Sequence, residues 1–241
     1  MTINEVLIKY EMQELMPKVA LNKATYSLRE GELNRNYEKA AKILNAFFKI
    51  SNNFKVNGLE NLDELKDSAY VVISNHKSSL DPIYLNCALK GYTKIRWISK
   101  AENFQNSFYN KFMELGQVIP LAKDKKMTLE TKERIREVFC KNEALGIFPE
   151  GTRNKSKELL DFHTGAARIC IENNVPYVPI ALIGNTKPFR GKVNVNVGRP
   201  VYLRRISADY DDYKIISIDM KDQLNELLRG NFNFFPAMYE K

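Results

Sequence analysis

Short apolar runs alternate along the chain with stretches in which apolar residues recur at helical spacing. The runs rich in strand-forming residues lie at residues 70–73, 94–99, 117–121, 145–148 and 177–183. The stretches with helical spacing lie at residues 83–89, 101–115, 128–141, 165–173 and 220–228. Strands that alternate with helices are typical of an α/β fold. We therefore expect an α/β layered domain with a largely parallel mixed sheet flanked by helices.

Three details refine this pattern. Residues 193–197 alternate valine and asparagine, which predicts a strand with one face in solvent. Thr128 stands directly before a helical stretch and is the residue type that caps a helix N-terminus. Gly230 follows the last apolar residues of the final helix and is expected to end it.

Residues 1–50 are predicted to form a helical segment ahead of a main domain at residues 51–241. The region from residue 35 to residue 50 has an apolar stripe made of Tyr37, Ala40, Ala41, Leu44, Phe47 and Phe48. A largely separate basic face contains Arg35, Lys39, Lys42 and Lys49. Such a basic amphipathic helix has two interpretations: it packs on the main domain, or it lies in a membrane interface with its lysines among anionic headgroups. The sequence leaves both open.

Charge and composition narrow the possible partners. The 241 residues contain 37 Lys and Arg against 29 Asp and Glu, a net charge of +8. An anionic partner is expected, either a phosphorylated substrate, a nucleic acid or an acidic membrane surface. The three cysteines are widely spaced within apolar patterns and are predicted to be reduced core residues. No apolar run approaches the roughly 18 residues of a membrane span, so any work at a membrane is expected at its surface.

Candidate chemistry begins at the end of the strand at residues 70–73. His76, one of two histidines, follows this strand, and Asp81 comes five residues later, directly before Pro82. A neutral imidazole beside a carboxylate is a suitable general base for an alcohol. However, Asp before Pro also starts helices well, so Asp81 has a purely structural explanation. The segment alone does not decide between the two.

A second candidate turn, Phe148-Pro149-Glu150-Gly151-Thr152-Arg153, follows another predicted strand. Gly151 permits a tight turn, Arg153 offers a planar fork suited to phosphate, and Thr152 adds a hydroxyl. Glu150 is a possible partner for a substrate hydroxyl or for Arg153. Taken alone, these residues are better explained as an ordinary strand-end turn with a solvated Glu and Arg.

Together the two segments carry a family resemblance. Asn75-His76-x-x-x-x-Asp81-Pro82 and the turn at residues 148–153 resemble the NHx4D and FPEGTR boxes of the glycerolipid acyltransferases, a family that includes bacterial 1-acylglycerol-3-phosphate acyltransferases. Their order and separation also fit. Three further segments agree: residues 100–102 with Gly116 and Ile119-Pro120, residues 162–167, and residues 175–180. The resemblance covers roughly residues 50–200, and four boxes in order are hard to obtain by chance.

The resemblance implies a role for each matching residue. His76 is the expected general base, and Asp81 is its orienting partner. Glu150, Gly151, Thr152 and Arg153 are expected to bind the glycerol phosphate end of an acceptor. Lys123 stands where the family usually has an arginine, and with Lys100 it is a further candidate for substrate binding. His163 stands where the family often has lysine, and we expect it to be structural or weakly phosphate-facing.

These roles imply acyl transfer from acyl-CoA or acyl carrier protein to the free hydroxyl of lysophosphatidic acid, giving phosphatidic acid. Residues 51–241 are then the catalytic domain. The expected partners are the acyl donor, a lysophospholipid acceptor and an anionic membrane surface, with no nucleic acid, no metal and no cofactor. We expect peripheral, monotopic attachment to the cytoplasmic face of the cell membrane. Another lysolipid or glycerol phosphate acceptor, and a non-catalytic lipid-binding protein, are the alternatives.

Overall fold

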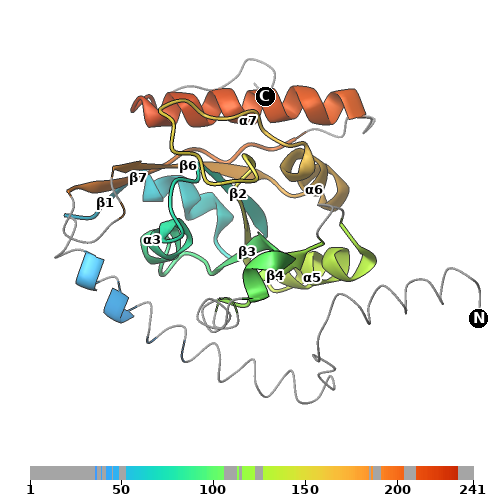
Figure 1. Cartoon of the computed structure of the whole chain (residues 1–241), viewed down its shortest axis with the longest axis horizontal. Coiled ribbons are helices and arrows are strands. Elements are labelled where there is room, and N and C mark those ends of the chain that lie inside the picture. The colour runs from blue at the N-terminus through green and yellow to red at the C-terminus, as the bar shows by residue number, and fades with distance from the viewer. Residues whose placement is uncertain are drawn as a thin grey trace, which may run out of the picture.

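The computed structural model describes residues 53–105, 113, 116–122, 127–184, 186, 191–203 and 210–232, together with residues 36, 39, 42–44 and 46–48 (Figure 1). Within this part of the chain, seven strands form one sheet in the order β1-β7-β6-β2-β5-β3-β4. Their bounds are Lys55–Asn57 (β1), Tyr70–Ser74 (β2), Ile95–Lys100 (β3), Ile119–Leu121 (β4), Ala144–Ile147 (β5), Tyr177–Gly184 (β6) and Val193–Val197 (β7). All neighbouring strands are parallel except β6 and β7. The predicted largely parallel mixed sheet is confirmed.

Helices cover both faces of this sheet (Figure 1). The helices whose bounds are described are η1 (Leu59–Leu65), α3 (Asp81–Ala88), η2 (Ala101–Gln105), α5 (Leu129–Cys140), α6 (Gly165–Asn173) and α7 (Tyr210–Leu228), and the described residues between 36 and 48 are helical as well. Tyr70 and Val72 of β2 pack into a core with α3, whereas Val71 and Ile73 pack into a second core with α5, α6 and α7. Because alternate strand residues point to opposite faces, one buried strand supports both layers.

The half-exposed strand predicted at residues 193–197 is wrong. β7 lies between β1 and β6, and Val193, Val195 and Val197 are fully buried. Asn196 is buried too: its Oδ1 accepts a hydrogen bond from Asn57 Nδ2 at 2.9 Å, and its Nδ2 donates to the Leu227 carbonyl at 3.1 Å. The second asparagine of the alternating pattern therefore meets polar groups of the protein instead of solvent, and the first, Asn194, is only partly exposed.

Other local predictions have mixed outcomes. The Thr128 cap of α5 is confirmed, since its side chain accepts a hydrogen bond from the Thr131 backbone N–H. The helix predicted from residue 101 begins as a 3₁₀ helix, and residues 106–112 lie outside the described part. Cys87 and Cys170 are buried, but Cys140 at the end of α5 is exposed, so the prediction of three core cysteines is wrong for that residue.

The described residues of the N-terminal segment both contact the domain and face solvent. Phe48 is buried and stacks on Tyr84 of α3, with ring centroids 3.9 Å apart, and Leu44 packs against the same core. Ile43 and Phe47 are exposed, as are Lys39 and Lys42. Leu44 and Phe48 therefore attach these helical residues to the domain, while the neighbouring apolar and basic side chains remain accessible. No helix among the described residues has the length and apolar character needed to cross a bilayer.

Candidate active site

The two candidate segments meet at one edge of the sheet. His76 follows β2 and the turn at residues 148–153 follows β5, and these strands are parallel neighbours. Parallel neighbours end at the same edge of a sheet, which is where α/β folds commonly bind ligands. Lys100 ends β3, the next strand along, and it is partly exposed. Residues far apart in the sequence are thus brought to one place by strand order.

Asn75 holds the end of β2 in position. Its side-chain Oδ1 accepts a hydrogen bond from the Leu182 N–H at 2.8 Å, and its Nδ2 donates to the Leu182 carbonyl at 2.9 Å. A side-chain amide here replaces the pair of backbone bonds that a further strand residue would make with β6. The chain is therefore free to turn at His76 without leaving buried polar groups of β6 unsatisfied.

The Asp81 carboxylate forms hydrogen bonds with the His76 ring and with the backbone of the turn between the two residues. Its Oδ2 lies 3.0 Å from His76 Nδ1 and accepts hydrogen bonds from the Lys77 and Ser78 backbone N–H groups, both at 2.7 Å. Asp81 is the first residue of α3, whose N-terminus has no side-chain cap. Its side chain thus orders the turn and contacts the imidazole, and helix capping does not explain it.

This contact selects a tautomer of His76. An ionised carboxylate only accepts hydrogen bonds, so the neutral imidazole must carry its proton on Nδ1. Nε2 then holds the lone pair that a general base needs. The His76 side chain keeps 18% of its surface accessible, whereas Asp81 is fully buried. The imidazole is therefore reachable from solvent while its carboxylate partner is not.

Glu150 and Asn154 hold the backbone of His76. The His76 N–H donates to Glu150 Oε1 at 3.0 Å, and the His76 carbonyl accepts from the Asn154 N–H at 2.6 Å. Glu150 Oε2 accepts from Asn154 Nδ2 at 2.7 Å and from the Leu160 N–H at 3.1 Å. Glu150 is only 3% exposed. Both of its oxygens thus accept hydrogen bonds from the protein and couple the two turns.

Gly151 is required by the packing of His163. Its φ of +64° lies in the left-handed region, and a Cβ there would stand 2.7 Å from Cδ2 of the His163 ring. The His163 backbone N–H also donates to the Pro149 carbonyl at 2.9 Å. His163 therefore braces the turn at residues 148–153, which agrees with the structural role expected for it.

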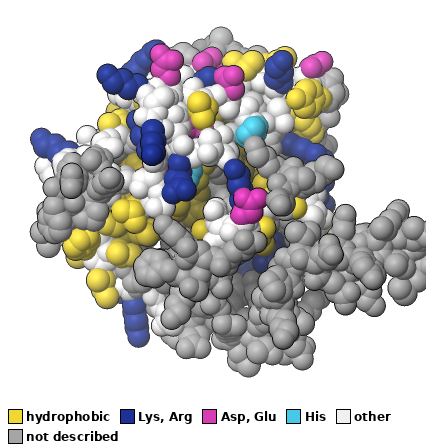
Figure 2. All heavy atoms as spheres, viewed as in Figure 1, with side chains coloured by type: hydrophobic (Ala, Val, Ile, Leu, Met, Phe, Trp, Pro, Cys, Tyr) yellow, Lys and Arg dark blue, Asp and Glu magenta, His cyan; other side chains and the backbone are white. Residues whose placement is uncertain are grey.

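Thr152 and Arg153 are the exposed residues of this turn. Figure 2 shows Lys and Arg side chains beside the histidine side chains on this face of the molecule. The structure thus brings His76, Asp81 and the turn at residues 148–153 together, with Lys100 on the same sheet edge. Lys123 lies outside the described residues. Sequence reasoning gave no role to Asn75 and did not single out Asn154.

The sequence model of the Acyltransferase family matches residues 53–183, more than half of the chain. The chain belongs to the acyltransferase family. The matched region contains Asn75, His76, Asp81 and the turn at residues 148–153. The site assembled at the sheet edge thus lies wholly within the part of the chain that the family model describes.

Several named proteins are similar to this acyltransferase. The chloroplastic 1-acyl-sn-glycerol-3-phosphate acyltransferase BAT2 of Brassica napus is 33% identical over 157 residues, which are 61% of this chain and 44% of that protein. The 1-acyl-sn-glycerol-3-phosphate acyltransferase of Helicobacter pylori is 32% identical over 161 residues, or 66% of this chain and 65% of that protein. The matches thus span about half to two thirds of these relatives.

A solved structure supports the fold. The 1-acyl-sn-glycerophosphate acyltransferase PlsC from Thermotoga maritima superimposes with a TM-score of 0.59 at 24% identity. The alignment covers 83% of this chain and 82% of that one. At this level of identity the likeness concerns architecture, and it agrees with the mixed sheet described above.

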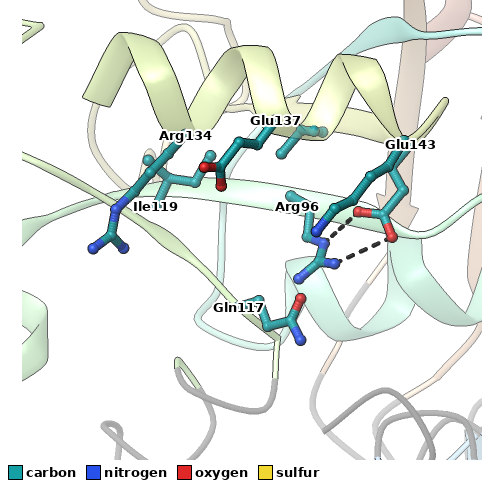
Figure 3. A pocket seen from close by; sticks show the side chains of 8 residues that line it. Arg96, Gln117, Ile119, Arg134, Glu137 and Glu143 are labelled. Atoms are coloured by element: carbon teal, nitrogen blue, oxygen red, sulfur yellow. Dashed lines mark hydrogen bonds and ion pairs between the residues drawn. The ribbon is translucent and has the colours of Figure 1, made fainter. Parts of the chain in front are cut away.

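A cavity elsewhere in the acyltransferase domain is not the candidate site. It has a volume of about 30 Å³ and lies beside α5, near Arg96, Gln117, Ile119 and Glu143 (Figure 3). Arg96 forms a bidentate ion pair with Glu143, with N···O distances of 2.5 Å and 3.1 Å. These residues lie toward the starts of β3, β4 and β5, whereas His76 lies past the end of β2. The cavity has room for about one or two water molecules, so we assign it no substrate.

Proposed function

We propose that this acyltransferase moves an acyl chain from an acyl thioester to the free hydroxyl of lysophosphatidic acid and so forms phosphatidic acid. The observation that carries the proposal is the His76–Asp81 pair held beside the turn that presents Arg153. The printed names of the Brassica napus and Helicobacter pylori relatives support the acceptor class. The donor is acyl-CoA or acyl carrier protein.

The reaction needs one base and a held acceptor. Nε2 of His76 takes the proton of the acceptor hydroxyl as its oxygen attacks the thioester carbonyl carbon. The tetrahedral intermediate then collapses with cleavage of the C–S bond, and the thiolate leaves and takes up a proton. A thiol has an ordinary pKa of about 8.5, so its departure needs little acid assistance. The products are an ester and a free thiol.

In this proposal the exposed residues of the turn at residues 148–153 bind the acceptor. The Arg153 guanidinium suits two oxygens of a phosphate at once, and Thr152 supplies a hydroxyl. Gly151 gives the turn its left-handed backbone and leaves room for the His163 ring. Lys100 and Lys123 add positive charge. Glu150, with both oxygens engaged by protein donors, supports the His76 turn in this proposal and does not contact the acceptor.

We also propose that the protein works at the cytoplasmic face of the cell membrane as a peripheral, monotopic protein. Ile43 is 70% exposed and Phe47 40% exposed, and Lys39 and Lys42, helical residues close to them in sequence, are exposed too. Apolar side chains flanked by lysines suit an interface that contains anionic lipids. This contact would bring the site to membrane-bound lysophospholipid.

The test is acceptor-dependent release of free thiol. The purified protein is incubated with acyl-CoA or acyl carrier protein, with and without a panel of lysolipids and glycerol phosphates. We expect thiol release and phosphatidic acid only when lysophosphatidic acid is present. Equal release without acceptor indicates a thioesterase. Vesicle flotation with no turnover on any pair indicates a lipid-binding protein.

A further inference from the structure

Three aromatic rings form a stack that ends on His76. The His76 and Phe148 rings have centroids 4.0 Å apart and planes 14° from parallel. The Phe148 and Trp97 rings have centroids 4.4 Å apart and planes 10° from parallel. If the His76 and Trp97 rings both lay on the same face of the Phe148 ring at these distances, their atoms would overlap. Phe148 therefore lies between His76 and Trp97.

The sheet order builds this stack. Trp97 is on β3, Phe148 follows β5 and His76 follows β2, and β5 lies between the other two strands. Gly146 of β5 leaves the space that the indole fills, because a Cβ there would be 2.5 Å from Cε3 of Trp97. Trp97 is 3% exposed, and its Nε1 has no hydrogen-bond partner among the described residues. Packing therefore holds the indole in place.

The stack and Asp81 contact His76 from different directions. Asp81 binds Nδ1 in the plane of the imidazole, whereas Phe148 covers one face of the ring. The face of an aromatic ring is negative and attracts a cation placed over it. When His76 takes a proton it becomes such a cation. Two carboxylates of the described residues also contact His76: Asp81 at the ring and Glu150 at the backbone N–H.

We propose that Phe148, held by Trp97 over Gly146, is a positioning residue that fixes the plane of the His76 ring and stabilises its protonated form during acyl transfer. This inference rests on the proposed function, in which His76 is the base. Because the imidazolium exists only after proton transfer, Phe148 acts on the transition state and not on substrate binding. It should therefore affect kcat and leave the acceptor KM nearly unchanged.

Graded fluorination of Phe148 tests the inference. Mono-, di- and trifluorinated phenylalanine at position 148 withdraw charge from the ring face with little change of size. We expect kcat to fall with each fluorine, by a total of about 2-fold to about 30-fold, the range that cation–π attraction supports. The same series at Phe54 is the control, since Phe54 is a buried aromatic that packs edge-on against Tyr84 and is far in sequence from both turns. It should leave kcat unchanged.

The outcomes separate this inference from the proposed function. A stepwise fall in kcat at position 148 alone, with a constant acceptor KM, supports it. A flat response across the series in active protein overturns it, and so does full kcat in Phe148→Leu. Inactivity of the unmodified protein with every donor and acceptor overturns the proposed function and this inference with it.

Discussion

Glu150→Gln separates a supporting role of Glu150 from direct contact with the acceptor. The change conserves size but replaces one carboxylate oxygen with an NH2 group. The two oxygens of Glu150 now accept from the His76 N–H on one side and from Asn154 Nδ2 and the Leu160 N–H on the other. Either orientation of the glutamine amide therefore sets its NH2 group against an N–H donor.

The cost follows from these contacts. One charge-assisted hydrogen bond contributes about 1.5–3 kcal/mol, and a buried N–H left without a partner costs about 1–3 kcal/mol. Because the groups are nearly buried, the His76 turn is expected to shift instead of finding water. A displacement near 1 Å costs roughly 100-fold in rate. We therefore expect kcat to fall about 10- to 100-fold, with the acceptor KM changed less than about 3-fold.

Steady-state kinetics over a range of acceptor concentrations, with thermal unfolding measured in parallel, checks this prediction. Glu158→Gln is the matched control, because it makes the same chemical change at an exposed side chain of the same loop. It should leave kcat and unfolding unchanged. A rise in acceptor KM with an unchanged kcat in Glu150→Gln would refute the supporting role and return Glu150 to the acceptor site.

Three further outcomes are expected. Arg153→Ala should raise the acceptor KM about 10-fold or more with little effect on the donor KM, and Arg153→Lys should restore only part of the loss; a larger donor effect would move Arg153 to the donor site. Phe47→Glu should weaken flotation with anionic vesicles, whereas the same change at exposed Ile215 of α7 should not. Burial raises the pKa of the Cys87 thiol to about 11, so at pH 8 alkylation should label exposed Cys140 first.

The order of the strands from β2 to β7 and of the α-helices was predictable because most of these elements carry their own periodic pattern, whereas the short elements β1 and η1 and the first half of α7 were not predicted. The run at residues 70–73 became a strand buried on both faces, and Thr128 caps its helix as its side chain allows. The prediction for residues 193–197 was wrong because one of the two asparagines, Asn196, has its hydrogen-bond partners far along the chain. The Asn196 side chain forms hydrogen bonds with Asn57 and with the Leu227 carbonyl, and the local sequence pattern does not predict these contacts.

The candidate site shows the same division. Its motifs marked His76, Asp81 and the turn at residues 148–153, and parallel strands brought them to one edge. The sequence could not separate helix capping by Asp81 from contact with His76, since both use the same carboxylate; only geometry distinguishes them. The contribution of Asn154 was likewise hidden, because its bonds to Glu150 and His76 depend on how two distant turns meet.

The general-base role of His76 is tested most directly by acceptor-dependent thiol release from His76→Ala, with circular dichroism and thermal unfolding to show that the fold persists. A positioned base contributes about 10²- to 10⁴-fold in rate, so we expect a loss in that range with a similar acceptor KM. Turnover within about 10-fold of the unmodified protein, in a variant that is fully folded, would contradict the account.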